Sequence, residues 1–428
     1  MLQCGITVKG SRMPELHFKG KEFVYNHHLT VPYRPLIAQP DKSLGDNQEN
    51  IIIHGDNLHA LKALLPRYAG KVDCTFFDPP YNTGNENWSY NDNVNNPIMR
   101  EWLSSNPVNK EDMLRHDKWA CMMYPRFKLL HELLSDRGSL WMTLDDNEIH
   151  HARMMLDDIF GSDNFVANIV WQKKYSTSND NTGIAPMHDH VLAYQKSSEW
   201  QRRLLERTED NDEQYRYEDQ NGVFRASDYT CNKTAEDRPN LFYPVTNPMT
   251  GAEVWPNRTR VWAYSREEHR KHVEKNLMFW GKDGKAKVPS FKRYRHLLRS
   301  GGGTVPTTWW PHEVVGHTDE AKKEINAIFS ANGTSVKKNL PVEELQVVAE
   351  SSPAYQREGA NIDFVTPTPT RLIERILQVA ADPDALILDS FAGSGTTAHA
   401  VLSLNAKDGG NRRFILVECE EYADTLTR

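Results

Sequence analysis

The chain has few cysteines and no long apolar run, and both shortages limit what it can be. Its five cysteines, Cys4, Cys74, Cys121, Cys231 and Cys419, are odd in number, far apart and never in a CxxC pair. We therefore predict no disulfide framework and no zinc or other metal site, and interpret the cysteines as reduced, mostly structural thiols. No apolar run approaches the roughly 18 residues of a membrane span, and the first residues lack the apolar stretch expected of a signal peptide. A cytoplasmic protein away from membranes is expected.

Acidic residues outnumber basic residues over the whole chain, but the basic residues are concentrated in one window. The 428 residues, 39% hydrophobic and 25% charged, carry a formal net charge of −7. Residues 251–300 hold thirteen Lys/Arg against five Asp/Glu, so this window carries +8 and the remainder −15. Because partner choice depends on local potential, the window indicates a polyanionic partner.

Alternating strands and helices occur at both ends of the chain but not in its middle. The pattern predicts a strand in IIIHGDNL, a helix in HALKALLPRY and a second strand in KVDCTFFDPPY, which together suit a parallel α/β sheet. A helix over 116–137 is expected to end at Gly138, before the strand SLWMTL. The predicted segments are an N-terminal arm (1–50), a first α/β part (51–195), an insert of other character (196–360) and a second α/β part (361–428).

A glycine turn opens the last α/β part. In LILDSFAGSGTTAHAVL, Gly393 and Gly395 permit positive φ and close approach of a ligand, and the next helix points its N–H groups at it. The turn lacks the lysine of a P-loop. Glu418, 23 residues after Gly395, supplies an acid for ribose hydroxyls, as dinucleotide sites do. On this motif alone, a nicotinamide cofactor and a merely structural turn both stay open.

The stretch Asp78-Pro79-Pro80-Tyr81 follows the second predicted strand. Proline has no N–H, so this loop offers carboxylate and carbonyl acceptors without two of its backbone donors. Such a surface suits an amino group, whose two protons are both donors. Hydrogen bonds to Asp78 and the Pro79 carbonyl would free the nitrogen lone pair of adenine or cytosine for attack, while Tyr81 stacks on a base taken out of the duplex. The alternative is a turn that simply ends a strand.

These motifs together resemble the amino-group DNA methyltransferases that use S-adenosylmethionine. DPPY precedes the insert and FAGSG follows it, as in the circularly permuted β group. The longer stretches GDNLHALKALLPRYAGKVDCTFFDPPYNTGN, TLDDNE, NKTAEDRPNLFYPVTNPMTGAEVWP, VVGHTDEAKKEI and LDSFAGSGTT resemble the modification (Mod) subunit of type III restriction-modification systems. The resemblance implies an α/β fold with a Rossmann-like, doubly wound, seven-stranded sheet. In it, strand 3 begins at Ile51, strand 4 ends at Asp78, strand 1 ends at Asp389 and strand 2 ends at Glu418.

The resemblance also assigns roles to individual residues. Asp78, Pro79, Pro80 and Tyr81 would be catalytic, within a core made of 51–195 and 361–428. Those implied to bind the cofactor S-adenosylmethionine are Asp56, Asp78, Asp389, Phe391, Gly393, Gly395 and Glu418. Asp78, Phe391 and Gly393 would lie near its methionine part, Glu418 would hold the ribose and Asp56 the adenine amino group. Asp56 is also a candidate helix N-cap, and the two roles can coexist.

The insert is expected to read the DNA sequence. Basic residues predicted to contact DNA are Arg258, Arg260, Arg266, Lys292, Arg293 and Arg295. Aromatic rings interleaved with them, among them Trp255, Trp262, Trp280 and Tyr294, could stack on displaced bases. The alternative is that the charges are solvated and the rings belong to a core.

The function expected is methylation of adenine N6 in double-stranded DNA, with a homodimer and a restriction (Res) subunit as implied partners. An Asp before PPY favours adenine over N4 of cytosine, which is the alternative within the family. Mod subunits usually continue well beyond strand 2, whereas this chain stops at Arg428. A truncated DNA-recognition subunit with little catalysis is therefore the other alternative.

Overall fold

The computed structural model describes residues 16–43, 49–83, 114–177, 183–208, 212–298, 303–329, 367–420 and 423. Two compact units make up the chain: unit 1 comprises Met1–Arg203 with Thr307–Arg428, and unit 2 comprises Leu204–Pro306. Unit 1 is built on one large sheet, and unit 2 on a smaller one. No helix among the described residues is long and apolar enough to span a membrane.

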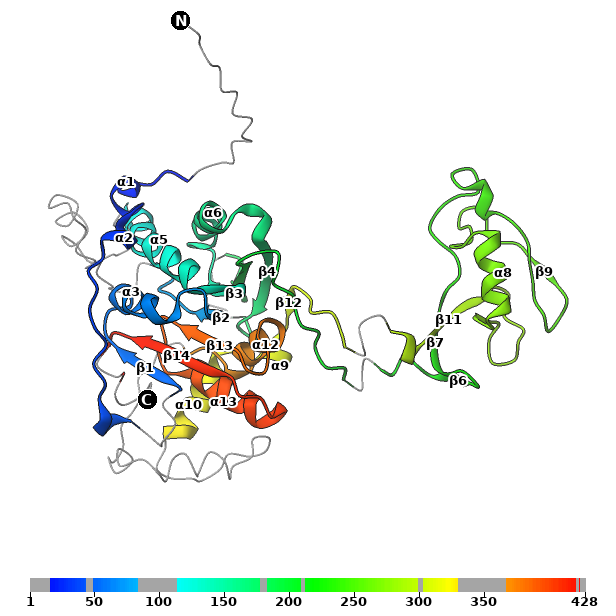
Figure 1. Ribbon diagram of the computed structural model, residues 1–428. Coiled ribbons are helices and arrows are strands. Elements are labelled where there is room, and N and C mark those ends of the chain that lie inside the picture. The colour runs from blue at the N-terminus through cyan, green and yellow to red at the C-terminus, as the bar shows by residue number, and fades with distance from the viewer. Residues whose placement is uncertain are drawn as a thin grey trace, which may run out of the picture. The chain divides into compact units, whose positions relative to one another are not determined.

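The sheet of unit 1 has the strand order β1-β14-β13-β2-β3-β5-β4-β12 (Figure 1). Its strands are β1 (Ile51–His54), β2 (Val72–Phe77), β3 (Leu134–Leu144), β4 (Phe165–Gln172), β5 (His188–Gln195), β12 (Trp309–Trp310), β13 (Leu386–Asp389) and β14 (Arg413–Glu418). All neighbours pair in parallel except β5, which runs antiparallel to β3 and β4. The first and last parts of the chain meet where β1 pairs with β14. The doubly wound, permuted sheet is thus confirmed, and β12 adds an eighth strand to the seven expected.

Helices cover both faces of this sheet (Figure 1). On one face lie α3 (Asn57–Tyr68), α5 (Arg115–Leu133) and α6 (Ile149–Phe160), and on the other α12 (Thr370–Ala380) and α13 (Thr396–Asp408). Among the described residues, the other helices of unit 1 are α1 (Lys21–Val24), α2 (His27–Thr30), α9 (His312–Val315) and α10 (Thr318–Phe329), with short 3-10 turns at Pro40–Lys42 and Ser162–Asn164. Because both faces are covered, all four residues of β13 are buried.

The boundary between α5 and β3 lies earlier than the sequence predicts. The helix ends at Leu133 and the strand begins at Leu134, because Leu134 pairs with Val72 at an irregular start of the ladder. Gly138 therefore does not end the helix but lies inside the strand. A Cβ atom there would lie 2.8 Å from the backbone oxygen of Val72, so the close approach of the two strands requires glycine.

Unit 2 holds a four-stranded antiparallel sheet in the order β10-β11-β7-β6 and a small ladder of β8 with β9. Its elements are β6 (Tyr217–Asp219), β7 (Gly222–Asp228), β8 (Val245–Thr246), β9 (Glu253–Val254), α8 (Arg266–Glu274), β10 (Met278–Phe279) and β11 (Ser290–Tyr294), with 3-10 turns at Pro239–Leu241 and Arg295–Leu297. Helix α8 begins with a capping box between Ser265 and Glu268. The core includes Tyr229, Tyr243, Trp262 and Trp280.

Unit 2 is shorter than the insert predicted from the sequence (196–360). Residues 309–310 form β12, which pairs with β4 in the sheet of unit 1, and α9 follows it in the same unit. The structure therefore draws the boundary of the compact insert near Pro306. The segment 330–366 lies outside the described residues, and the role of the insert in target recognition stays a prediction.

Candidate active site

The carboxyl ends of four adjacent parallel strands bring the predicted site residues to one edge of the sheet. These strands are β1, β14, β13 and β2, in that spatial order. Ligands of open α/β sheets bind at this edge, beside the position where the strand order reverses. Chain segments more than 300 residues apart are tied together here, since the Asn57 side chain donates to the Ser390 carbonyl at 2.9 Å.

Two threonines hold the Asp78 carboxylate in one orientation. The Thr143 hydroxyl donates to Oδ1 at 2.5 Å, and the Thr368 hydroxyl donates to Oδ2 at 2.7 Å. Thr143 comes from β3, the neighbour of β2 in the sheet, whereas Thr368 precedes α12. Each carboxylate oxygen has further lone pairs, so Asp78 can still accept a hydrogen bond from a bound amine.

The rest of the DPPY loop is fixed by α5 and leaves one carbonyl open. The indole Nε1 of Trp119 donates to the Pro80 carbonyl at 2.7 Å. Among the described residues, no hydrogen bond reaches the Pro79 carbonyl oxygen. Asp78 and the Pro79 carbonyl therefore both keep acceptor capacity on this loop, and their binding of an amino group stays a prediction.

Tyr81 lies next to a partly buried ion pair that the sequence did not indicate. The Lys173 ammonium is 4.9 Å from the centre of the Tyr81 ring and 2.6 Å from Oδ2 of Asp189. Burial, with the negative charges of Asp78 and Asp189, raises the pKa of the Tyr81 hydroxyl well above its ordinary value. Burial also raises the pKa of Asp189, an effect that Lys173 opposes. The loop thus presents a neutral phenol.

The glycine turn after β13 is organised by Asp389. This carboxylate is 2% exposed and accepts hydrogen bonds from the Thr397 hydroxyl and from the Phe391 N–H at 3.0 Å. Gly393 and Gly395 have φ of 52° and 78°, in the left-handed region that favours glycine, and Gly395 is the N-cap of α13. The Phe391 ring stacks on Phe77, with centroids 6.1 Å apart, at the end of β2.

Glu418 and Asp56 already have partners within the fold. Glu418 accepts backbone N–H groups from Gly393 (2.7 Å), Cys419 (2.9 Å) and Glu420 (3.0 Å). Asp56 is the N-cap of α3, accepting from the His59 N–H at 3.2 Å, so the predicted cap is present. The other carboxylate oxygen of Asp56 lies 3.7 Å from the Arg126 guanidinium, and the Asp56 side chain is 45% exposed. Cofactor binding by either acid stays a prediction.

The basic residues predicted to contact DNA differ in how the structure presents them. Arg258 is 76% exposed, and Arg260 and Arg295 remain about half exposed while paired with Asp228 and Asp212. Arg266, which begins α8, lies 5.2 Å from the Tyr243 ring, and Arg293 is exposed on β11. Lys292 instead is 7% exposed, and its ammonium is 2.7 Å from Asp219. We therefore leave Lys292 out of the proposed DNA contacts, because a buried, paired ammonium cannot reach a phosphate.

Most aromatic rings of the basic window build the core of unit 2. Trp262, Trp280 and Tyr294 are 0%, 6% and 4% exposed, whereas Trp255 is 51% exposed. The expectation that these rings stack on displaced bases is thus wrong for the three buried ones. Of these three, only Tyr294 lies on a strand, β11, where it alternates with the exposed Arg293.

Sequence reasoning missed several residues of this edge, including Thr143, Thr368, Trp119, Lys173 and Asp189. Thr143 carried a usable signal, since it lies near the end of the strand expected to follow β2. Thr368 carried none, because a threonine 290 residues from Asp78 reaches it only through the fold. The strand order, the reversed β5 and the two motifs at the carboxyl edge define a Rossmann-like fold of the methyltransferase type.

Comparison with known proteins gives the family. The profile of the DNA methylase family (N6_N4_Mtase) matches residues 72–427, so the chain belongs to that family. It is 31% identical over 393 residues to the StyLTI Mod subunit, a type III restriction-modification enzyme of Salmonella typhimurium, covering 89% of this chain and 54% of the relative. It is 31% identical over 396 residues to the type II methyltransferase M.KpnI of Klebsiella pneumoniae, covering 87% and 81%. The resemblance to Mod subunits is therefore confirmed.

The chain spans about half the length of its StyLTI relative, 54%. Among solved structures, it is similar to the M1.HpyAVI–SAM complex, with 13% identity and a TM-score of 0.34, covering 87% of this chain and 94% of that one. The fold assignment rests on the strand order of unit 1 and not on that score.

Proposed function

We propose that the chain is a DNA methyltransferase that moves a methyl group from S-adenosylmethionine to N6 of adenine. The observation that carries the proposal is the acceptor pair of Asp78 and the Pro79 carbonyl, fixed at the carboxyl end of β2 beside the glycine turn of β13. Membership of the DNA methylase family supports it independently.

The geometry suits activation of an exocyclic amine. Its lone pair is delocalised into the base, so the nitrogen is a poor nucleophile until both N–H bonds are directed at acceptors. Asp78 and the Pro79 carbonyl supply two acceptors on one rigid loop, placed before the reaction begins. As the nitrogen formed its bond to the methyl carbon, the bond from that carbon to the donor sulfur would break, and its electron pair would stay on the sulfur of the departing thioether. The nitrogen would become cationic, and the Asp78 carboxylate would stabilise that charge until a proton left for Asp78 or water. The neutral Tyr81 ring offers a face for the displaced base.

The residues of the neighbouring turn fit the methyl donor, whose sulfonium supplies an electrophilic methyl group. Gly393 and Gly395 allow close approach of a ligand to the backbone, and Glu418 is a carboxylate at the end of β14 that can accept ribose hydroxyls. Asp56 stands at the end of β1, next to β14, exposed enough to accept an adenine amino group. A positively charged donor is also favoured by the negative charge of the Asp78 carboxylate.

Two surfaces are proposed to contact DNA. In unit 2 these are the exposed Arg258, Arg260, Arg266, Arg293 and Arg295. In unit 1, an open hollow of about 580 Å³ lies after the end of β4 and is lined by Tyr175, His312, His317, Asp319, Lys322 and Lys323. Strand β4 runs parallel to β3, so this hollow opens at the same edge of the sheet as Asp78. Its lysines and rings suit a phosphate backbone and an unstacked base.

The relatives suggest the biological setting. StyLTI Mod is named as a subunit of a type III restriction-modification enzyme. We propose the same role for this chain, with a restriction (Res) subunit and a second copy of itself as partners. Co-purification with a Res protein encoded beside it, and the mass of the complex in solution, test both partners.

The test of the proposed activity is transfer of a labelled methyl group from S-adenosylmethionine to mixed-sequence DNA. Asp78→Ala should abolish transfer while leaving DNA affinity within about three-fold, since its contact forms mainly at the reacting amine. The exposed Asp384→Ala, before the opposite end of β13, is the matched control and should retain full activity. Unchanged turnover in Asp78→Ala would defeat the assignment. DNA binding without transfer by the wild-type chain would favour the recognition subunit instead.

A further inference from the structure

Asn82, the residue directly after Tyr81, has an unusual backbone and a buried side chain. Its φ is 60°, in the left-handed region that asparagine tolerates better than most residues. The side chain is 0% exposed, and its amide nitrogen donates to Oε1 of Glu148. A polar side chain so deeply buried at the end of the reacting loop needs an explanation.

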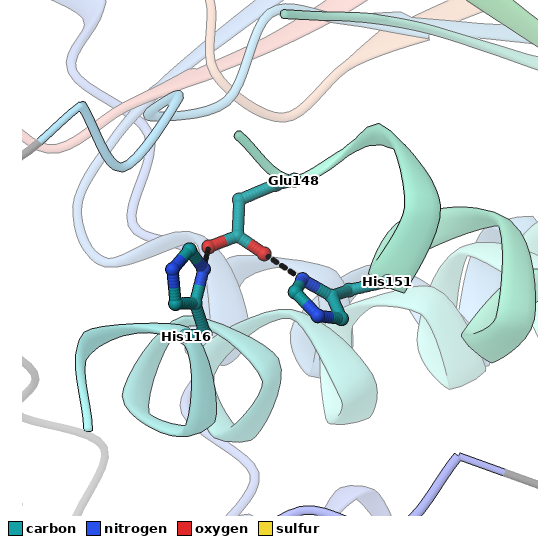
Figure 2. A group of neighbouring side chains, drawn as sticks. All are labelled: His116, Glu148 and His151. Carbon is teal, nitrogen blue, oxygen red and sulfur yellow. Dashed lines mark hydrogen bonds and ion pairs between the residues drawn. The ribbon is translucent and has the colours of Figure 1, made fainter. Parts of the chain in front are cut away.

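Glu148 is a fully buried carboxylate with three side-chain donors. It is the N-cap residue of α6, 0% exposed, and lies between two imidazoles (Figure 2). Nδ1 of His116, from α5, is 2.6 Å from Oε1, and Nδ1 of His151, from α6, is 2.8 Å from Oε2. The carboxylate raises the pKa of His151 through this hydrogen bond. The histidines therefore offset the desolvation of Glu148 and fix its orientation.

The same three side chains could in principle hold a metal ion, since their ligand atoms lie within 4.8 Å of one another. The contacts favour hydrogen bonding. Each imidazole Nδ1 is at hydrogen-bond distance from a different carboxylate oxygen, and the amide of Asn82 also donates to one of them. A carboxylate surrounded by donors is already satisfied without a cation.

We infer that Glu148, oriented by His116 and His151, is a positioning residue that anchors the reacting loop through Asn82. The loop is then fixed at three places: the Asp78 carboxylate by two threonines, the Pro80 carbonyl by Trp119 and the Asn82 amide by Glu148. The open Pro79 carbonyl lies between these anchors, so its direction depends on all of them. The inference rests on the proposed function, in which Asp78 and Pro79 accept the protons of the target amine.

The Asn82→Gly variant removes the side-chain hydrogen bond to Glu148 but keeps a residue that can adopt the positive φ of this position. Glycine adopts positive φ freely, so the loop conformation stays accessible while the amide is lost. We expect the single-turnover rate of methyl transfer to fall about 10- to 100-fold, because displacements near 1 Å at a reacting group have such effects. Affinity for S-adenosylmethionine and for DNA should stay within about three-fold, since neither site includes Asn82.

Glu148→Gln tests the other partner, and the double variant tests their coupling. If Asn82 acts through Glu148, Asn82→Gly with Glu148→Gln should be no slower than the slower single variant. The matched control is Asp146→Asn, two residues away on the same segment with a side chain 73% exposed, which should leave the rate unchanged. Additive losses of rate, or a rate within about two-fold of wild type in Asn82→Gly, would overturn the inference.

A readout that does not depend on activity completes the test. Amide hydrogen exchange of the peptide carrying Tyr81, Asn82 and Thr83 should be faster in Asn82→Gly and Glu148→Gln, and unchanged in Asp146→Asn. Equal exchange in all variants would overturn the anchor even if the wild-type chain methylated nothing, an outcome that would instead defeat the proposed function. Stoichiometric metal in the purified protein, lost in His116→Ala, would also overturn it, because the cluster would then be a metal site.

Discussion

Replacing the buried Asp389 by asparagine should change how stability depends on pH. Burial raises the pKa of Asp389 from 3.8 to about 7, with the negative charges of Asp78 and Glu418 adding to the effect and the Thr397 and Phe391 hydrogen bonds opposing it. Because the folded pKa lies above the unfolded one, the protonated acid stabilises the fold. That contribution is complete below pH 3.8 and is lost as pH rises through about 7.

Between about pH 5 and pH 8, these two pKa values imply a loss on the order of 2–3 kcal/mol in the free energy of unfolding. An asparagine side chain cannot ionise, so the D389N variant should lack this loss and gain relative to wild type as pH rises. Its amide can still donate to the Thr397 hydroxyl, which limits the cost of the change at low pH.

The assay is urea unfolding over that range of pH, followed by the fluorescence of the tryptophans buried in unit 1, among them Trp119, Trp141 and Trp171. The difference between variant and wild type isolates Asp389, since most other groups titrate equally in both. The exposed Asp384→Asn is the control, and its difference from wild type should be constant. If the difference in unfolding free energy between D389N and wild type stays constant within about 0.5 kcal/mol across this pH range, the raised pKa of Asp389 is refuted.

Three further changes probe other parts of the site. Tyr81→Ala should weaken capture of the displaced base by about 1–3 kcal/mol, measured with 2-aminopurine at the target position, and an unchanged signal would make Tyr81 structural. Glu418→Gln should raise the dissociation constant for S-adenosylmethionine about ten-fold by loss of a charge-assisted hydrogen bond, measured by calorimetry, where equal affinity would remove Glu418 from the site. If Arg293 contacts a phosphate, Arg293→Ala should lower the slope of log DNA affinity against log salt concentration by about one. Lys292→Met, at a buried position, should leave that slope unchanged. Equal slopes in the two variants would mean that residues 251–300 form an ordinary solvated surface.

Much of the fold could be predicted because its determinants are local. The ends of β13 and β14 at Asp389 and Glu418 follow from short apolar runs that stop at an acid. The glycine turn needs positive φ at Gly393 and Gly395, which the residue type itself reveals. The start of β3 was missed because Leu134 continues the helical apolar pattern, and only its pairing with Val72 draws it into the sheet.

The site was predicted less completely because its supporting contacts are long-range. Asp78 was identifiable from DPPY, but Thr368, which orients it, is distant in the sequence. Lys292 looked like its neighbour Arg293, since composition does not show which face of β11 each occupies. Burial separates them: alternate residues of a strand point to opposite faces, so Lys292 turns toward Asp219 while Arg293 stays exposed.

The loop after Tyr81, NTGNENWSYNDN, is a second candidate for sequence recognition. Asn82 and Thr83 are described, and residues 84–93 lie outside the described residues. If the unit 2 arginines prove indifferent to both salt and sequence, this loop is the next segment to substitute.

The most direct test of the account is the chemical identity of the methylated nucleoside. DNA incubated with the purified chain and labelled S-adenosylmethionine would be digested and its nucleosides separated by mass spectrometry. We expect label in N6-methyladenine with wild type and none with Asp78→Ala. Label in N4-methylcytosine would keep the amino-group chemistry and contradict the adenine assignment. Label in 5-methylcytosine, or transfer that survives in Asp78→Ala, would contradict the central claim that this loop activates an amine.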